Sequence, residues 1–469
     1  MISKVINSSA IFFVSSILTR GLGLLLLPIF TQYLSAEDYG LFELIFITST
    51  VLCMLLPLEI SQSVARFYTE KNAGNSIFST GVFFTIIGYV GFSLLFQTIV
   101  HWFKLEHFFT PFFYENILII NGLFLSYGIF YILQNQFKWR LEPHLYALTS
   151  VAYSLLVLAL SYYYLVVAVI GLKGVLLAYM ISGFCCSIFC VYKLRKELFV
   201  LPSLVVFKKL LAFSIPLVPA SLSIWLMQSL DRVMLSSLNG LVEVGTFSIA
   251  AKFANIGLLA ITAIQSALTP LIYKHHTEHD TPDKIASILS IYLTMCLIII
   301  LGAFLFSDNL VDIFVSGDFG QVAIVICVLV PAILFNGLYI FFPGLYIFKK
   351  TKSIMWLSIF STILNVIFNG LLIPSYGAIG AAIATLLSSS MYVALIYHFS
   401  SKLYPCPYKF RGFISWLVAM LLLIILFTFF DGLIMPFVTK VMIFILLFSV
   451  IVYTRHQFEL KTIIKKKEA

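Results

Sequence analysis

Two basic residues, Arg20 and Lys252, lie within long apolar segments of the chain. At ~1.5 Å per helical residue, Arg20 lies roughly 18 Å and Lys252 roughly 14 Å from the start of its segment. Both are then near the middle of a ~30 Å hydrocarbon core, where a charge costs at least ~2.5 kcal/mol and rarely faces lipid. Guanidinium and ammonium groups both bind phosphate. The two residues therefore predict a cationic chamber that binds an anion, and pairing with a local acid or snorkelling remains the alternative for each.

A second pair of charges, Asp231 and Arg232, is adjacent in the apolar context "QSLDRVML". It lies ~28 Å from the start of its segment, so it is near the opposite mouth and not at the centre. Neighbouring residues on a helix point about 100° apart, so the two side chains need not pair with each other. Two interpretations remain open, a rim or gate of a cavity and an interfacial pair with a snorkelling arginine.

Acidic residues within apolar segments are few. Glu59 is deep in the second segment and is the candidate for coupling to an ion, with a purely local partner as the alternative. Glu43, Glu115 and Asn116 are interpreted as local partners or interfacial groups.

The composition places these charges in a membrane. The 469 residues are 61% hydrophobic and 10% charged, and their mean hydropathy is +1.05. Soluble domains have about 45–50% apolar and about 25% charged residues. The sequence therefore predicts an all-α polytopic membrane protein.

About 20 mostly apolar residues suffice for one spanning helix, and the chain offers about fourteen such segments. Prolines within them predict kinks at Pro28, Pro57, Pro216, Pro219, Pro331 and Pro343. The predicted spans are 8–34, 40–63, 77–100, 111–136, 144–168, 171–192, 213–238, 243–272, 285–306, 320–347, 354–373, 377–400, 412–430 and 436–454.

The basic residues give the orientation. If alternate connections are cytoplasmic, beginning with the N-terminus, 23 of the 29 lysines and arginines fall on that side, 3 on the other and 3 within spans. This asymmetry follows the positive-inside rule. It predicts an even number of spans with both termini in the cytoplasm, and it accounts for the net charge of +9 without nucleic acid.

The connections between spans are short, which leaves no room for a soluble catalytic domain. No cofactor motif is present, and the seven cysteines form no CxxC pair and are interpreted as small hydrophobic residues. The polar stretch "HHTEHD", with His275, His276 and His279, is interpreted as a loop and not as a metal site. The N-terminus is interpreted as a first span and not as a removed signal peptide.

The chain contains an internal repeat. "GLKGVLLAY" from Gly171 aligns with "GAIGAAIAT" from Gly377, and "AEDYGLFELI" aligns with "LVEVGTFSIA", at offsets of 206 and 205. Six spans per repeat make the repeats parallel, and such transporters place their substrate site between the halves. We expect one six-helix lobe at 1–200, a second at 201–405, and two additional helices with a basic tail at 406–469.

Several motifs in this order resemble a known family. They are Arg20-Gly21 with Pro28, Thr31, Leu34 and Asp38-Tyr39-Gly40, then "FSIPLVPASLSIWLMQSLDRVML" with "VGTFSIAAKF", and then "NVIFNGLLIPSYGAIGAAIAT". Over about residues 1–400 the chain resembles the polysaccharide-export flippases of the multidrug/oligosaccharidyl-lipid/polysaccharide (MOP) superfamily. It resembles Wzx-type O-antigen flippases most, and the lipid II flippase is a more distant relative.

The resemblance implies a V-shaped pair of six-helix lobes in a bacterial inner membrane and a transporter, not an enzyme. Such proteins move undecaprenyl-pyrophosphate-linked O-antigen or capsule repeat units from the cytoplasmic to the periplasmic leaflet. On matching positions, Arg20 and Lys252 belong to the family's cationic cavity, and Asp231 and Arg232 match its seventh-span pattern. The resemblance also suggests contacts with an O-antigen polymerase and a chain-length regulator.

Two other functions remain open. A MATE-like, cation-coupled drug exporter should present acids in its cavity, whereas the mid-membrane charges here are Arg20 and Lys252. An O-antigen polymerase-type enzyme needs a large external loop or an acidic catalytic site, and the short connections argue against it.

Overall fold

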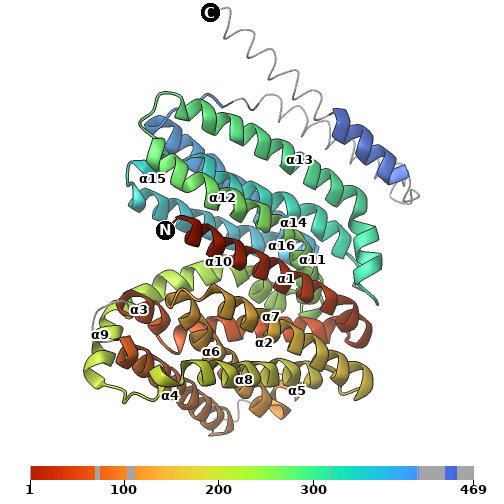
Figure 1. Cartoon of the computed structure of the whole chain (residues 1–469). Coiled ribbons are helices and arrows are strands. Elements are labelled where there is room, and N and C mark those ends of the chain that lie inside the picture. Colours follow the sequence, from red (N-terminus) through yellow and green to blue (C-terminus); the bar gives the residue numbers. More distant parts are fainter. Residues whose placement is uncertain are drawn as a thin grey trace, which may run out of the picture. The chain divides into compact units, whose positions relative to one another are not determined.

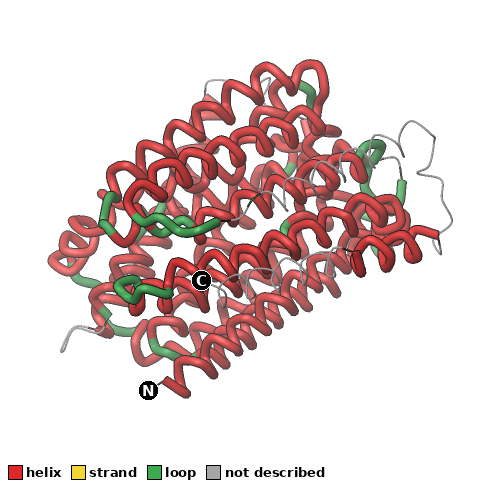
Figure 2. The backbone as a smooth tube through the Cα atoms, turned by 90° about the horizontal axis from the view of Figure 1, so that it is seen from above, coloured by secondary structure: helices red, strands yellow, loops and turns green. Residues whose placement is uncertain are grey.

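The computed structural model describes residues 2–68, 74–102, 111–317, 319–408, 410 and 439–450. In these ranges all regular secondary structure is helical (Figures 1 and 2). Eleven of the described helices are long and apolar enough to span a membrane. The predicted all-α membrane fold is confirmed. The number of fourteen spans stays a prediction, since span 412–430 and part of 436–454 lie outside the described residues.

The chain forms two compact units, Met1–Val233 and Met234–Ala469. The predicted division at 1–200, 201–405 and 406–469 stays a prediction. The first unit contains α1 Ile2–Tyr33, α2 Ala36–Leu55, α3 Ile60–Phe67, α4 Gly74–Trp102, α5 Pro111–Glu115, α6 Ile117–Trp139, α7 Pro143–Tyr162 with the π-helical turn η2 Tyr163–Val167, α8 Gly171–Leu198, α9 Leu204–Ser214, the 3-10 turn η3 Ile215–Leu217 and most of α10 Val218–Leu238.

The second unit begins within α10. It contains α11 Leu241–Ala254, α12 Ile256–His275, α13 Thr281–Phe314, α14 Val322–Asn336, the 3-10 turn η4 Gly337–Phe341, α15 Gly344–Ile347, α16 Thr351–Leu403 and a short apolar helix at Thr439–Val450.

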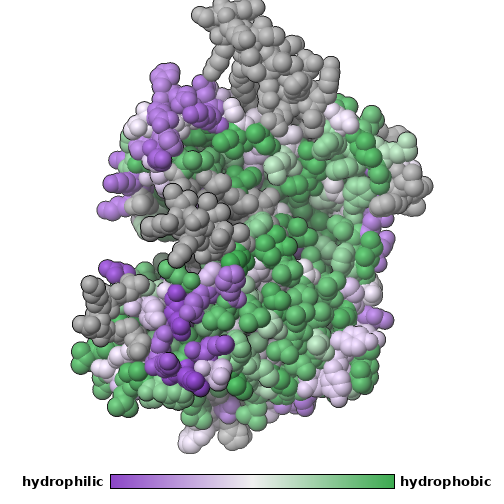
Figure 3. Space-filling model, in the orientation of Figure 1, coloured by the Kyte–Doolittle hydropathy of each residue, from purple (hydrophilic) through white to green (hydrophobic). Residues whose placement is uncertain are grey.

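The core of the first unit lies between α3, α4, α6, α8 and α9. Val64, Phe78, Phe137 and Leu194 are each at most 1% exposed and belong to one apolar cluster. Large apolar side chains also cover much of the outer surface (Figure 3), and Leu95 and Ile188 are 64% and 69% exposed. An apolar interior combined with an apolar exterior fits a protein whose solvent is lipid.

Several of the predicted spans are interrupted. The second breaks at the turn Leu56–Glu59, which contains Pro57, and the tenth changes to η4 and then α15 around Pro343. Pro216 lies in the 3-10 turn η3, and Pro219 lies in the first turn of α10, where a missing N–H is tolerated. At Pro28 and Pro331, by contrast, the helices continue past the proline.

Other interruptions have no proline at the break itself, although Pro374 lies three residues before Gly377. Asn255 separates α11 from α12, Asn116 separates α5 from α6, and Gly377 breaks the regularity of α16. The two predicted spans 354–373 and 377–400 correspond to the two helical parts of α16 that meet at the kink.

The first pair of glycines that the repeat aligns, Gly171 and Gly377, both have positive φ. Gly171 at the start of α8 has φ +58°, and Gly377 has φ +52°. After Gly377 the helix restarts, and the backbone N–H of Ala378 donates to Glu243 Oε2 of α11 at 2.6 Å. The positive φ of Gly377 turns the chain, and the carboxylate of Glu243 accepts from an N–H at the start of the new helical segment. Together they allow the helix to begin again.

Replacing Gly377 with alanine should destabilise the protein by at least about 1 kcal/mol, because an L-residue is disfavoured at positive φ. The new Cβ would also lie 2.5 Å from Glu243 Oε2. Gly370→Ala is the matched control in the same helix, since a Cβ there meets no atom within 4 Å. Thermal unfolding of both variants in detergent measures the effect, and equal Tm values would contradict the prediction.

Candidate functional site

Arg20 lies on an exposed side of α1, the helix that packs against α7 in the first unit. Ser16, one turn earlier, is exposed on the same side. A Cβ placed on Gly21 or on Gly23 would meet no atom within 4 Å. Arg20 is therefore an exposed residue on a helix that is long enough to span a membrane.

Lys252 lies in the last turn of α11 in the second unit. Its side chain is half-buried, whereas Phe253 and Ala254 after it are buried. A cation at this place interacts favourably with the negative end of the helix dipole. The structure thus gives Lys252 a local stabilising role, and its share in a common chamber with Arg20 stays a prediction.

Asp231 and Arg232 differ in their surroundings. Asp231 is 7% exposed. Arg232 is half-buried, and its Nη1 donates to the carbonyl oxygen of Gln228 in the preceding turn at 3.1 Å. Arg232 also interacts electrostatically with Tyr39 of α2. The rim or gate stays a prediction, and the electrostatic interaction of Arg232 with Tyr39 is between α10 and α2.

A buried acid beside this contact was missed as a site residue by sequence reasoning. Glu43 is 5% exposed, and the Tyr39 hydroxyl donates to its Oε1 at 3.0 Å. Tyr179 of α8 also interacts electrostatically with Glu43. The spacing of Tyr39 and Glu43, four residues apart on one helix face, is the signal that could have found the pair.

Glu59 occupies the interruption between α2 and α3. Leu58 and Glu59 both have positive φ, +50° and +57°, which is a strained conformation for such residues. The Glu59 side chain is 5% exposed and interacts electrostatically with Cys53 and Tyr131. A buried carboxylate on strained backbone is compatible with the predicted coupling role, which stays a prediction.

A polar network closes one end of the first unit. Glu197 at the end of α8 accepts hydrogen bonds from Gln136 Nε2 at 2.8 Å and from the Tyr68 hydroxyl at 3.1 Å. Arg140 Nη1 lies 3.2 Å from the same carboxylate. Burial is the larger cause and the negative charge of Glu197 the second of a rise in the pKa of Tyr68 to about 12. The hydroxyl therefore keeps its proton and donates at neutral pH.

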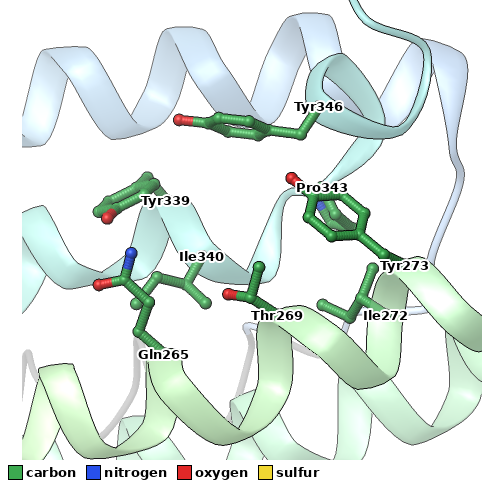
Figure 4. Close-up of a pocket in the computed structure, with 8 residues that line it drawn as sticks. All are labelled: Gln265, Thr269, Ile272, Tyr273, Tyr339, Ile340, Pro343 and Tyr346. Carbon is green, nitrogen blue, oxygen red and sulfur yellow. The ribbon is translucent and has the colours of Figure 1, made fainter. Parts of the chain in front are cut away.

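The second unit contains a pocket of ≈ 120 Å³ between α12 and the η4–α15 segment (Figure 4). Four residues of one α12 face line it, and four more come from the opposite wall. They are Gln265, Thr269, Ile272 and Tyr273 on α12, and Tyr339, Ile340, Pro343 and Tyr346 opposite. The polar residues Gln265, Thr269 and Tyr273, four apart in an apolar segment, were a sequence signal that the predicted site left out.

The pocket wall is shaped by the end of α14. The buried Tyr292 hydroxyl donates to the carbonyl oxygen of Leu334 at 2.6 Å, at the point where α14 becomes η4. A Cβ on Gly337 would lie 2.5 Å from that hydroxyl, so only glycine fits there. The 3-10 turn that follows carries Tyr339 and Ile340 into the pocket wall.

The described part of the chain contains no group of three or more His, Cys, Asp or Glu side chains that could hold a metal ion. In the loop of the three histidines, His275 contacts Glu278 and His276 contacts the Tyr273 carbonyl oxygen. All seven cysteines are free thiols.

A comparison with protein families decides the class of this chain. The family model described as "Polysaccharide biosynthesis protein" matches residues 5–276, more than half of the 469 residues. The chain belongs to this family. A second model, MatE, matches residues 216–371. The resemblance to the polysaccharide flippases of the MOP superfamily is thereby confirmed.

Two curated relatives have related names. The probable low-salt glycan biosynthesis flippase Agl15 of Haloferax volcanii is 24% identical over 179 residues, which are 37% of this chain and 38% of that protein. The capsular polysaccharide biosynthesis protein CapF of Staphylococcus aureus is 27% identical over 206 residues, which are 42% of this chain and 51% of that protein. The matched region thus covers only about two fifths to half of the length of these curated relatives.

Solved structures of the superfamily share the fold. The lipid II flippase MurJ gives a TM-score of 0.69 at 15% identity, over 97% of this chain and 100% of that chain. An inward-facing multidrug resistance MATE transporter of the MOP superfamily gives a TM-score of 0.66 at 16% identity. The match covers 82% of this chain and 94% of that chain. At these identities the likeness concerns the fold alone.

Tyr292→Phe should destabilise the second unit by about 1–3 kcal/mol, because it leaves the buried Leu334 carbonyl without this donor. Tyr376→Phe is the control, since Tyr376 is 59% exposed and the change removes only an exposed hydroxyl. The midpoints of thermal unfolding of the two purified variants should differ by several degrees. If Tyr292→Phe melts like the wild type, the hydroxyl does not hold this segment.

Proposed function

We propose that the protein is a flippase that moves undecaprenyl-pyrophosphate-linked oligosaccharide repeat units from the cytoplasmic to the periplasmic leaflet. It acts as a transporter by alternating access and not as an enzyme. Membership of the polysaccharide biosynthesis family and the flippase and capsule names of two relatives support this proposal. O-antigen or capsule units are the specific substrates that the proposal names.

The observation that carries the proposal is the exposed position of Arg20 on a helix that is long and apolar enough to span a membrane. A charge at mid-membrane rarely faces lipid, so open space beside it should be a water-filled, substrate-accessible cavity. The open surface at Gly21 and Gly23 supports this argument. A cation in such a cavity favours an anionic substrate, and a pyrophosphate-linked sugar is one.

The proposed mechanism gives each charged residue a role. Arg20 binds pyrophosphate oxygens with its bidentate fork, and Lys252 adds a point charge from the other unit. In a low-dielectric cleft these charges replace part of the hydration that the head group loses. Asp231 and Arg232 form the rim or gate, and Glu59 couples the cycle to an ion.

The proposal also includes the location and partners of the protein. It is placed in a bacterial inner membrane with both termini cytoplasmic, as the distribution of basic residues predicts. Two six-helix lobes, 1–200 and 201–405, alternate around the substrate, and residues 406–469 add two helices. An O-antigen polymerase and a chain-length regulator are the protein partners.

A second candidate function is a cation-coupled drug exporter. The MatE match over residues 216–371 and the buried acid Glu43 favour it. A cationic drug, however, would meet the exposed charge of Arg20 on α1, whereas an anionic head group would be attracted. The charge of the transported molecule therefore separates the two functions.

Arg20→Ala and Lys252→Ala should each reduce export of lipid-linked repeat units at least tenfold while the protein still inserts. The reason is the loss of a cation that substitutes for phosphate hydration. Surface polysaccharide in a deletion strain complemented with each variant, together with protein abundance in the membrane, measures the effect.

Lys173→Ala is the matched control, because Lys173 is exposed in the first turn of α8 and carries the same charge outside the predicted chamber. It should leave export unchanged. Arg20→Lys should retain part of the activity. Normal surface polysaccharide with both alanine variants would rule out the cationic chamber.

A further inference from the structure

The pocket in the second unit has no assigned ligand. It lies in the half of α12 that ends at His275 and on the η4–α15 segment that precedes Lys349, the side that we predict to be cytoplasmic. In Figure 4, Gln265 and Thr269 rise from α12 and face the rings of Tyr339 and Tyr346 across the pocket. Its volume of ≈ 120 Å³ accommodates several water molecules.

The lining is mainly apolar and aromatic, it includes a few polar groups, and it is uncharged. Of the eight lining residues, three are tyrosines, and Gln265 and Thr269 add an amide and a hydroxyl. None is Asp, Glu, Lys or Arg. The lining thus combines aromatic faces with groups that both donate and accept hydrogen bonds.

We infer that this pocket binds one uncharged pyranose ring of the lipid-linked glycan. A pyranose presents a face of polarised C–H groups, which an aromatic ring attracts through its negative π face, and an edge of hydroxyls. The Tyr339 and Tyr346 rings, 6.5 Å apart and inclined by 42°, supply such faces. Gln265 and Thr269 supply partners for the hydroxyl edge. This inference rests on the proposed function and adds a sugar subsite to it.

Other ligand classes fit the lining less well. A phosphate needs a cation, and none of the eight lining residues is one. A cationic drug could contact the tyrosine rings, but the lining offers no acid to pair with its charge, and Gln265 and Thr269 would gain nothing from it. A lipid tail needs no hydrogen bonds, yet its entry would cover the polar groups of Gln265 and Thr269 without replacing their partners. The exposed Lys349 and Lys350, which follow Tyr346 by three and four residues, leave a place for phosphate outside the pocket.

The walls are held in place before any ligand binds. The N–H of Gly344 donates to Ser400 Oγ of α16 at 2.7 Å. The Tyr404 hydroxyl donates to the His276 carbonyl oxygen at 3.0 Å, at the end of α12. A preformed pocket loses little entropy on binding, so even a single sugar ring should bind measurably.

The test uses the full-length protein purified in a sugar-free detergent, because glycoside detergents would occupy the pocket. Saturation-transfer NMR with methyl glucopyranoside, methyl galactopyranoside and N-acetylglucosamine should give a saturable signal on the sugar C–H protons for at least one of them. Tetraphenylphosphonium and inorganic pyrophosphate, as probes of the other two chemistries, should not compete with it.

Gln265→Leu and Tyr339→Leu should each weaken sugar binding at least tenfold, and Tyr376→Leu, on an exposed side chain outside the pocket, should not. Thr269→Val keeps the side-chain shape and should weaken binding severalfold in a protein that still folds. No saturable signal from any of the three sugars, displacement by tetraphenylphosphonium, or an equal loss in Tyr376→Leu would overturn the inference.

The test of the sugar subsite and the test of the flippase function can fail independently. If the wild type exports lipid-linked glycan but the pocket variants bind sugar and export like the wild type, the subsite is wrong and the flippase stands. If the pocket binds sugar but the protein moves no lipid-linked glycan, the flippase is wrong.

Discussion

Backbone hydrogen bonding inside the bilayer is the constraint on which the rest of this structure depends. Hydrocarbon offers no partner for N–H and C=O groups, so a spanning segment is helical and any interruption must satisfy its own backbone groups. The turn at Glu59 does so with the Glu59 N–H donating to the Met54 carbonyl oxygen at 3.0 Å. At the kink in α16, Glu243 accepts from the Ala378 N–H. Such interruptions place polar side chains in otherwise apolar segments.

The residues with chemistry cluster at these interruptions. Glu59 lies within one, Lys252 lies three residues before Asn255, and the pocket wall begins where α14 becomes a 3-10 turn. Arg20 is different, because α1 continues through it and its charge lies on the helix surface. An exposed cation on a continuous helix is best explained by a polar substrate path, whereas a buried acid on a broken helix is best explained by coupling or by local structure.

The fold class and most of the spans could be predicted from hydropathy alone, because membrane insertion depends on local composition. The breaks at Pro57 and Pro343 were visible for the same reason, since proline acts locally. The break at Gly377 was also predicted, as the boundary between the spans 354–373 and 377–400, although its partner Glu243 was not. The break at Asn255 lies inside the predicted span 243–272 and was missed, because no proline marks it. The Tyr39–Glu43 pair was visible in the four-residue spacing on one helix and was overlooked. The pocket at Gln265 could not be predicted, because its opposite wall comes from the η4–α15 segment, which only folding brings to α12.

The charged residues illustrate the same limit. Depth along a helix can be counted from the sequence, so Arg20 could be recognised as a cation inside a span. What surrounds a side chain depends on the packing of other helices, so the burial of Asp231 and the electrostatic interaction of Arg232 with Tyr39 could not be anticipated.

The central claim is that the protein moves an anionic, lipid-linked glycan across a bilayer. The most direct measurement reconstitutes the purified chain in vesicles that carry an undecaprenyl-pyrophosphate-linked oligosaccharide and follows its exposure on the opposite leaflet with an impermeant glycan-modifying enzyme. The account predicts exposure that depends on the protein and is inhibited by excess unlabelled lipid-linked glycan. No exposure of the glycan, together with transport of a cationic dye by the same vesicles, would contradict it.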